Sequence, residues 1–308
     1  MHLGIDLGGT KTEIIALNGR SDTLYRKRVP SPKGSYQNTL ANLCQLVHEA
    51  EEHLGHTGTL GVGIPGALSP ETGRIKNANS TWLIGHDLKT DLSQRLKRPV
   101  LIANDADCFT LSEASDGAAA DHSVVFGVIL GTGVGGGICI DHNLLSGPNA
   151  IAGEWGHNPL PWSKASDLPA PCYCGKTGCI ETFLSGPGFK RQYADALPSL
   201  RTIDMTDDVT SEMIIDKAGT GDPAALSLLE TYQNQLARAL ASVINILDPG
   251  CIVLGGGMSN ITAIYSGLHD AIGHYVFSDT LNTTIARAKH GDASGVRGAA
   301  WLGSRNHV

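Results

Sequence analysis

Residues 3–17 read Leu-Gly-Ile-Asp-Leu-Gly-Gly-Thr-Lys-Thr-Glu-Ile-Ile-Ala-Leu, which is an apolar run, a glycine turn and a second apolar run. Apolar and β-branched residues at 3–7 and 13–17 predict two strands, with Gly8 and Gly9 at the hairpin turn between them. Glycine at such a turn permits positive φ and lets the backbone approach a ligand closely.

The same order returns later in the chain. Val124–Leu130 is a strongly apolar strand, Gly131-Thr-Gly-Val-Gly-Gly-Gly137 follows, and Ile138–Ile140 returns as a strand. A third run, Gly255-Gly-Gly257, follows the apolar strand 251–254 and is expected to lead into another helix. One such loop could be a plain tight turn, but three loops, two of them in repeated strand–turn–strand units, favour binding of phosphate, the usual ligand of clustered backbone N–H groups.

Two common nucleotide motifs nearly fit these loops. Gly131–Gly136 matches G-x-G-x-x-G, but the dinucleotide fingerprint needs a helix after the loop, and a strand follows here. Gly4 and Gly9 have P-loop spacing, but Thr10-Lys11 reverses the required Lys-Ser/Thr order. Both alternatives are therefore disfavoured.

The remaining pattern alternates helices and strands. Leu40, Leu43, Cys44 and Val47 recur at helical spacing and predict a helix over 37–54 that Gly55 ends. Strands are expected at 60–64 and 100–103, an alanine-rich helix to about 120, and a long helix over 223–247 with Leu236, Leu240, Val243, Ile244 and Leu247 as its buried stripe. The order predicts an α/β protein with a boundary near residue 118.

Cys172, Cys174 and Cys179 fall within eight residues, separated by glycines. Thiolates at this spacing suit a soft cation such as zinc, and His157 upstream can supply the fourth ligand. Four protein ligands leave no open position, so the expected zinc is structural. The alternative to a zinc site is a set of buried free thiols.

The other four cysteines lie in apolar contexts and are expected in the core. These are Cys44, Cys108, Cys139 and Cys251, and Trp155 and Trp162 are expected there as well.

Composition narrows the class further. The net charge is −7 and the only short basic run, Arg26-Lys-Arg28, is expected on a solvated strand edge, which argues against nucleic acid as a partner. An odd count of seven cysteines, no leader before residue 3 and no apolar run of membrane length predict a cytoplasmic protein with reduced thiols.

At this point the residues resemble a known family. Asp6-Leu-Gly-Gly-Thr-Lys, Gly131-Thr-Gly133, Glu154-x-Gly-His157 and Cys172-x-Cys174-Gly-x-x-Gly-Cys179-x-Glu181 together resemble the ROK family of sugar kinases and repressors. The resemblance runs the whole chain length. Within the family, 63–66, 76–83 and 153–161 look most like bacterial fructokinases that also accept mannose.

The resemblance implies a two-lobed actin/hexokinase-like (ribonuclease H-like) fold with a central interdomain cleft. The expected smaller lobe comprises residues 1–118 with a C-terminal helix of about 294–308. The expected larger lobe comprises residues 119–293 and carries the zinc-binding loop. A homodimer is expected by the same resemblance.

Phosphoryl transfer to an alcohol needs a base, a cation and a phosphate cradle. Asp105 lies at the carboxyl end of a strand, where α/β folds place their chemistry, and is the candidate catalytic base. Asn104 can both donate to and accept from a sugar hydroxyl. Asp107 is the rival base, but a first-turn helix acid explains it better. The resemblance places Mg²⁺ near Asp6, through water.

The other roles follow the family pattern. The ATP phosphates are expected at Gly8, Gly9, Thr10, Lys11, Gly131, Thr132 and Gly133, and the adenosine at Gly255, Gly256 and Gly257. The sugar is expected at Glu154, His157 and Glu181, with further contacts from Gly66 and Asn79 and with Asn104 and Asp105 at the reacting hydroxyl. If one His157 nitrogen binds zinc, the other is fixed toward the sugar.

The leading hypothesis is an ATP-dependent hexose kinase that converts D-fructose to its 6-phosphate, with mannose as a second substrate. Glucokinase and N-acetylglucosamine kinase of the same family are the alternatives. A sugar-responsive repressor is disfavoured because the first strand begins at residue 3, which leaves no room for a helix-turn-helix module. An actin/Hsp70-like chaperone is disfavoured because that group lacks the cysteine cluster.

Overall fold

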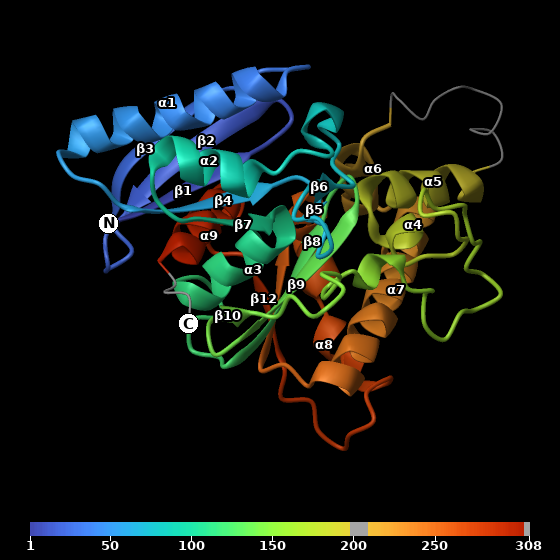
Figure 1. The fold of residues 1–308 in the computed structure, drawn as a ribbon. Coiled ribbons are helices and arrows are strands. Elements are labelled where there is room, and N and C mark those ends of the chain that lie inside the picture. Colours follow the sequence, from blue (N-terminus) through green and yellow to red (C-terminus); the bar gives the residue numbers. More distant parts are fainter. Residues whose placement is uncertain (198–208, 305–308) are drawn as a thin grey trace. The chain divides into compact units, whose positions relative to one another are not determined.

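The computed structural model describes residues 1–197 and 209–304, and Figure 1 shows its fold. One five-stranded sheet has the order β3-β2-β1-β4-β7, with β1 (His2–Leu7), β2 (Lys11–Leu17), β3 (Thr23–Pro30), β4 (Thr59–Ile64) and β7 (Val100–Asn104). Another has the order β10-β9-β8-β11-β12, with β8 (Val124–Leu130), β9 (Val134–Ile140), β10 (Asn143–Leu144), β11 (Cys251–Gly255) and β12 (Thr284–Arg287). Strands β5 (Ala67–Leu68) and β6 (Ile75–Lys76) form a small hairpin. The expected α/β class is confirmed.

Both predicted strand–glycine–strand units are present. β1 and β2 pair antiparallel from His2–Leu17 to Leu7–Thr12, with the glycine turn between them. β8 and β9 are neighbours in their sheet, joined by 131–133. The third loop differs: after β11 the chain forms the 3₁₀ helices η4 (Gly257–Asn260) and η5 (Thr262–Tyr265), and the α-helix expected there begins only at Leu268.

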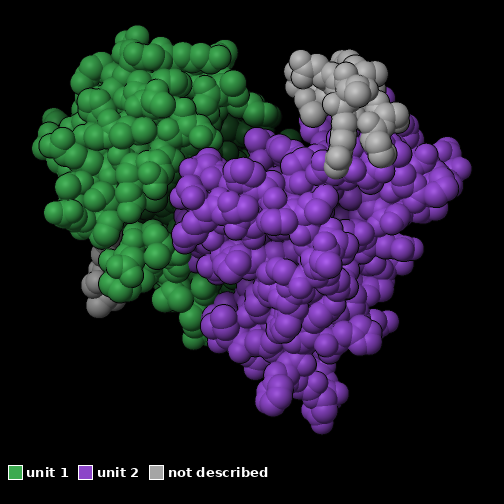
Figure 2. All heavy atoms as spheres, turned by 90° about the vertical axis from the view of Figure 1, so that its right-hand side faces the viewer, with its two compact units in different colours: residues 1–127, 137–152, 288–308 green, residues 128–136, 153–287 purple. Residues whose placement is uncertain are grey.

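The chain forms two compact units, which Figure 2 colours separately. Unit 1 comprises residues 1–127, 137–152 and 288–308, and unit 2 comprises 128–136 and 153–287, so that the division falls within β8 and β9. The expected lobe boundary near residue 118 stays a prediction. Within the described ranges, no helix has the length and apolar character that crossing a membrane requires.

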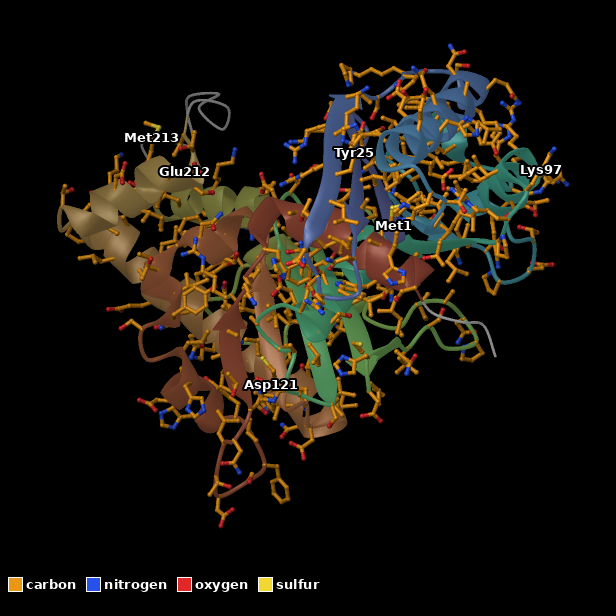
Figure 3. The ribbon with its side chains drawn as sticks, turned by 90° about the vertical axis from the view of Figure 1, so that its left-hand side faces the viewer. Met1, Tyr25, Lys97, Asp121, Glu212 and Met213 are labelled. Carbon is orange, nitrogen blue, oxygen red and sulfur yellow. The ribbon has the colours of Figure 1, made fainter. Side chains whose placement is uncertain are left out.

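In unit 1 helices cover both faces of the first sheet (Figure 1). α1 (Tyr36–Leu54) and α2 (Leu88–Leu96) pack on one face, and α3 (Asp105–Ser115) and α9 (Ser294–Gly303) pack on the other. Ser35 caps the start of α1, and Gly55 ends it at φ 75°, as predicted. Lys97, labelled in Figure 3, ends α2 in the same left-handed conformation at φ 54°.

The close seating of α9 on the sheet depends on two strand glycines. A Cβ on Gly4 would lie 2.3 Å from the backbone N of Ala300, and one on Gly61 would lie 2.0 Å from the backbone O of Ala299. Any larger residue would push the helix away, because these contacts are backbone atoms. The last four residues of the predicted C-terminal helix, 305–308, lie outside the described residues.

In unit 2 the helices gather around the long helix α7 (Pro223–Leu247). These are α4 (Glu181–Leu184), α5 (Gly186–Ala196), α6 (Ser211–Gly219) and α8 (Leu268–Gly273). The predicted apolar stripe of α7 is buried at Leu236, Leu240 and Ile244, and half-buried at Val243 and Leu247. Among the residues that the structure describes, both units also contain short 3₁₀ helices. These are η1 (Thr81–Leu83), η2 (Trp155–His157) and η6 (Gly291–Ala293).

The core predictions are confirmed with one correction. Cys44, Cys108, Cys139 and Cys251 are all buried, and so is Trp155. Trp162 was expected in the core, but half of it is exposed. Its ring lies against Tyr275 with the centroids 5.4 Å apart, so it covers a surface aromatic rather than filling the interior.

Candidate active site

Two acidic side chains predicted from separate motifs approach each other in unit 1. β1, β4 and β7 are adjacent parallel strands whose register aligns Asp6 with Gly63 and Gly63 with Ala103. Asp6 near the end of β1 and Asp105 just after β7 therefore lie at the same sheet edge. Burial, reinforced by the nearby carboxylates of Asp105 and Glu13, raises the pKa of Asp6 to about 6.

Asp105 is the first residue of α3. Its Oδ1 accepts the backbone N–H of Ala106 at 2.9 Å. The surrounding protein raises the pKa of Asp105, against the effect of that hydrogen bond, although water still reaches the side chain. A carboxylate with a raised pKa accepts a proton more readily, as a general base must.

Asn104 and Asp107 have the roles of helix-start residues. Asn104 caps α3, and its Oδ1 accepts the backbone N–H of Asp107 at 2.6 Å. That bond engages the amide oxygen of Asn104, and its amide NH₂ can only donate a hydrogen bond. Asp107 lies in the first turn of α3, the position that the sequence analysis preferred for it.

The first glycine loop is a tight turn at the end of β1. The N–H of Gly8 donates to the carbonyl of Lys11 at 3.0 Å, and Gly9, Thr10 and Lys11 are exposed. Gly295, in the first turn of α9, lies against Asp6, since a Cβ there would sit 3.2 Å from its Oδ2. The contact places a helix N-terminus beside this carboxylate and had no signal in the sequence.

Gly66 and Asn79 also belong to unit 1. Gly66 has φ 82°, and a Cβ there would lie 2.5 Å from the carbonyl oxygen of Lys76. This fixes the chain turn that leads into the β5–β6 hairpin. Asn79 is exposed just before η1.

In unit 2 the four predicted metal ligands come together. The ligand atoms of His157, Cys172, Cys174 and Cys179 all lie within 4.8 Å of one another. The Sγ atoms of Cys174 and Cys179 are 3.6 Å apart, and Cys172 Sγ is 3.6 Å from His157 Nδ1. Ligands of a tetrahedral zinc with bonds of about 2.3 Å lie roughly 3.8 Å apart, so the donor set fits that ion.

Backbone pairing joins the two loops that carry these ligands. Pro159 forms a bridge with Cys179, and the N–H of Ile180 donates to the carbonyl of Asn158 at 2.9 Å. Leu160 N–H donates to Gly178 at 3.1 Å. Glu154 is exposed on the first loop, and Glu181 is half-buried after the second.

Glu181 also contacts the second glycine loop. Its Oε2 accepts the backbone N–H of Val134 at 2.9 Å. A Cβ on Gly133 would lie 2.7 Å from the same oxygen, so a larger residue there would have to displace this carboxylate. A predicted sugar residue therefore lies against a predicted phosphate loop, Gly131–Gly133, and against Val134 that follows it.

The second nitrogen of His157 has a partner that the sequence did not suggest. Nδ1 points toward the cysteine cluster, while Nε2 lies 2.9 Å from the hydroxyl of Tyr173. The protein around the hydroxyl, with the charges of Glu181 and Glu154, raises the pKa of Tyr173. Position 173 is the variable residue of the C-x-C motif, so no pattern marks it.

The third glycine loop packs tightly on β8. Gly256 has φ 82°, and a Cβ there would lie 2.4 Å from the carbonyl of Leu130. Gly256 also accepts the hydroxyl and the N–H of Ser259. This loop and Gly131 thus adjoin in unit 2, as expected of two parts of one nucleotide site.

A buried ion pair holds the loop that follows the His157 segment. Arg238 of α7 binds Asp167 at 2.9 Å and donates to the carbonyls of Pro161 and Trp162. The side chains of Arg238 and Asp167 are 1% and 3% exposed. Burial opposes ionisation, but hydrogen bonds from Arg238 and the Lys164 N–H lower the pKa of Asp167.

Comparison with known proteins finds a matching family over nearly the whole chain. A profile described as "ROK family" matches residues 2–306. The chain belongs to the ROK family. It is 40% identical over 311 residues to an N-acetyl-D-glucosamine kinase of Pectobacterium atrosepticum, covering 98% of each protein.

Solved structures of ROK proteins have the same fold. A ROK hexokinase from Thermus thermophilus aligns with a TM-score of 0.84 and 29% identity over 98% of this chain and 97% of that one. A ROK glucokinase from Streptomyces griseus, in complex with glucose and AMPPNP, aligns with a TM-score of 0.74 and 26% identity over 98% of each chain. The predictions of the fold and of an ATP-dependent sugar kinase are confirmed.

The expected fructose preference is not supported. Relatives that are 38–40% identical to this chain are named N-acetyl-D-glucosamine kinases, which matches the alternative instead. The fructose prediction rests only on the overall likeness of residues 63–66, 76–83 and 153–161 to fructokinases.

Proposed function

We propose that this ROK kinase transfers the γ-phosphoryl group of ATP to the 6-hydroxyl of N-acetyl-D-glucosamine. The observation that carries the choice of sugar is the 40% identity, over 98% of both chains, to a kinase named for it. The cluster of Glu154, His157 and Glu181 supports a polyhydroxyl substrate, because carboxylates accept hydrogen bonds from hydroxyl groups.

In this proposal Asp105 accepts the proton of the attacking hydroxyl, which the raised pKa of its carboxyl group favours. Asn104 donates to a neighbouring sugar oxygen through its free amide NH₂. Gly66 and Asn79 complete the sugar contacts of unit 1. The oxygen then attacks the γ-phosphorus in line with the departing ADP.

The nucleotide is assigned to the glycine loops. Gly8, Gly9, Thr10 and Lys11, together with Gly131, Thr132 and Gly133, are proposed to hold the phosphates, and Gly255–Gly257 the adenosine. Asp6 is proposed to hold Mg²⁺ through water, and the ion would neutralise charge on the phosphates. This role would explain why an acidic residue interrupts an apolar strand.

Zinc is the proposed occupant of the cysteine cluster. His157, Cys172, Cys174 and Cys179 fill a tetrahedral shell, so the ion would stabilise the two loops without taking part in the reaction. A homodimer, closure of the two lobes over the sugar, and a cytoplasmic location stay predictions.

A coupled ADP-release assay with N-acetylglucosamine, glucose, mannose and fructose tests the proposal. The expected kcat/KM is at least about tenfold higher for N-acetylglucosamine than for the other three sugars. A preference for glucose, mannose or fructose would refute the sugar and leave the kinase class intact. ADP release equal with and without every sugar would refute the assignment as a sugar kinase.

A further inference from the structure

The side chain of Tyr173 is exposed without a packing reason. It is 84% accessible to solvent, so its ring gains little from burial. The ring nevertheless makes a defined contact, because it meets His157 edge-on with centroids 5.1 Å apart and an interplanar angle of 87°. An exposed tyrosine held in one place is a feature of binding sites more than of cores.

The backbone around Tyr173 is held on both sides. Cys172 and Cys174 are cluster residues, the N–H of Cys172 donates to Lys176 at 2.8 Å, and Gly175 donates back to Cys172 at 3.0 Å. The phenol therefore projects from a tight turn, which limits the conformational entropy lost when a ligand binds.

The hydroxyl of Tyr173 has one proton free for a ligand. His157 directs Nδ1 at the cluster. When zinc is bound there as proposed, Nδ1 carries no proton and the ring proton lies on Nε2. Nε2–H then donates to the Tyr173 oxygen across 2.9 Å. The phenol accepts that bond and keeps its own O–H to donate elsewhere.

Carboxylates lie close to this hydroxyl. Glu181 Oε1 is 3.9 Å from Sγ of Cys172, the residue before Tyr173, and both Glu181 and Glu154 act electrostatically on the phenol. Carboxylates serve sugar hydroxyls well, but they repel a carbonyl oxygen, which can only accept. A carbonyl-bearing substituent bound here requires a neutral donor.

We infer that Tyr173 is a substrate-contacting specificity residue that donates a hydrogen bond to the carbonyl oxygen of the 2-acetamido group of the sugar. The inference rests on the proposed function, since an acetamido sugar is the substrate assigned there. Recognition of the carbonyl is a role that Glu154, His157 and Glu181 do not have in the proposed function. His157 holds the phenol in place, and the phenol binds the carbonyl oxygen.

The test is the steady-state kinetics of Tyr173→Phe with N-acetylglucosamine and with glucose, which has a hydroxyl in place of the acetamido group. Loss of one neutral hydrogen bond should lower kcat/KM for N-acetylglucosamine roughly 3- to 10-fold, mainly through KM, and change the value for glucose less than about twofold. Metal content and the KM for ATP should match the wild type. Tyr25→Phe, on β3, is the control and should change neither sugar.

Calorimetric titration of N-acetylglucosamine into the wild type and into Tyr173→Phe, without ATP, measures the same effect as a change in the dissociation constant. An unchanged dissociation constant and kcat/KM overturn the inference while the proposed function stands. An equal fall for both sugars also overturns it, because the phenol would then act only through the position of His157. A wild-type enzyme that does not use N-acetylglucosamine overturns both proposals.

Discussion

Glu181 and Val134 are joined by a 2.9 Å hydrogen bond from the backbone N–H of Val134 to the carboxylate of Glu181. The glutamate directly follows the cysteine motif, and the valine directly follows the second glycine loop. One side chain therefore connects the proposed sugar site to the proposed phosphate site within unit 2.

Two variants of Glu181 should separate these connections. Glu181→Ala removes the acceptor and should raise KM for both sugar and ATP, by roughly tenfold or more, since a hydrogen bond to a charged group contributes about 1.5–3 kcal/mol. Glu181→Gln keeps an oxygen for Val134 and should raise KM mainly for the sugar. Steady-state kinetics with each substrate varied checks this, and equal ATP KM values in the two variants would contradict it.

Asp105→Asn should lower kcat by about 10²- to 10⁴-fold, because the amide cannot accept the hydroxyl proton. Binding of an ATP analogue, followed by calorimetry, should stay close to wild type. Asp107→Asn is the matched control two residues along α3, and it should retain most of the turnover. If the Asp107 variant is the inactive one, the roles are reversed.

Asp105 and Asp6 show which parts of the site the sequence could predict. Strand position identified both acids, and β-branched patterns placed both hairpins, because these depend on short-range order along the chain. The contact of Gly295 with Asp6 and the seating of α9 on Gly4 depend on residues nearly three hundred positions apart. No local pattern encodes such contacts, and the same holds for the hydroxyl of Tyr173 on His157.

Activity should fall as the pH drops below about 6, the pKa of Asp6. Protonation removes the negative charge that is proposed to hold Mg²⁺ through water. A profile of kcat/KM against pH, at saturating Mg²⁺, measures this. A profile that is flat from pH 7 to pH 5 would argue against an essential Asp6 carboxylate.

Asp6→Asn should be inactive but more stable than wild type at neutral pH. The folded pKa of about 6 lies above an unfolded value of about 3.9, so ionised Asp6 destabilises the fold, by at most about 3 kcal/mol. That penalty develops as pH rises from about 4 to 6 and is constant above. Thermal melts should therefore show a higher Tm for the variant at pH 7.5 and a smaller gap at pH 4.5.

Cys174→Ser should abolish stoichiometric zinc and lower Tm, because it removes one of four ligands that clamp two loops. Elemental analysis with parallel melts gives both readouts. Cys44→Ser, at a buried cysteine of unit 1, controls for loss of a thiol and should keep its metal. If the wild-type protein is purified without chelator and contains no zinc, the proposed zinc site is wrong.

Arg238→Met should cost about 3–5 kcal/mol of unfolding free energy, since it leaves the Asp167 carboxylate buried without its charged partner. The loop that carries Pro161 and Trp162 also loses two hydrogen bonds. Because this loop follows His157 in the chain, the KM for the sugar should rise.

The lowered pKa of Asp167 gives this effect a pH dependence. The ion pair stabilises the fold above the unfolded pKa of Asp167, and this contribution is lost as pH falls through the folded pKa. Urea unfolding at pH 7 and pH 3 should therefore show a smaller difference between variant and wild type in acid. The double variant Asp167→Asn with Arg238→Met removes both charges and should recover part of the loss, which a role in volume filling alone does not predict.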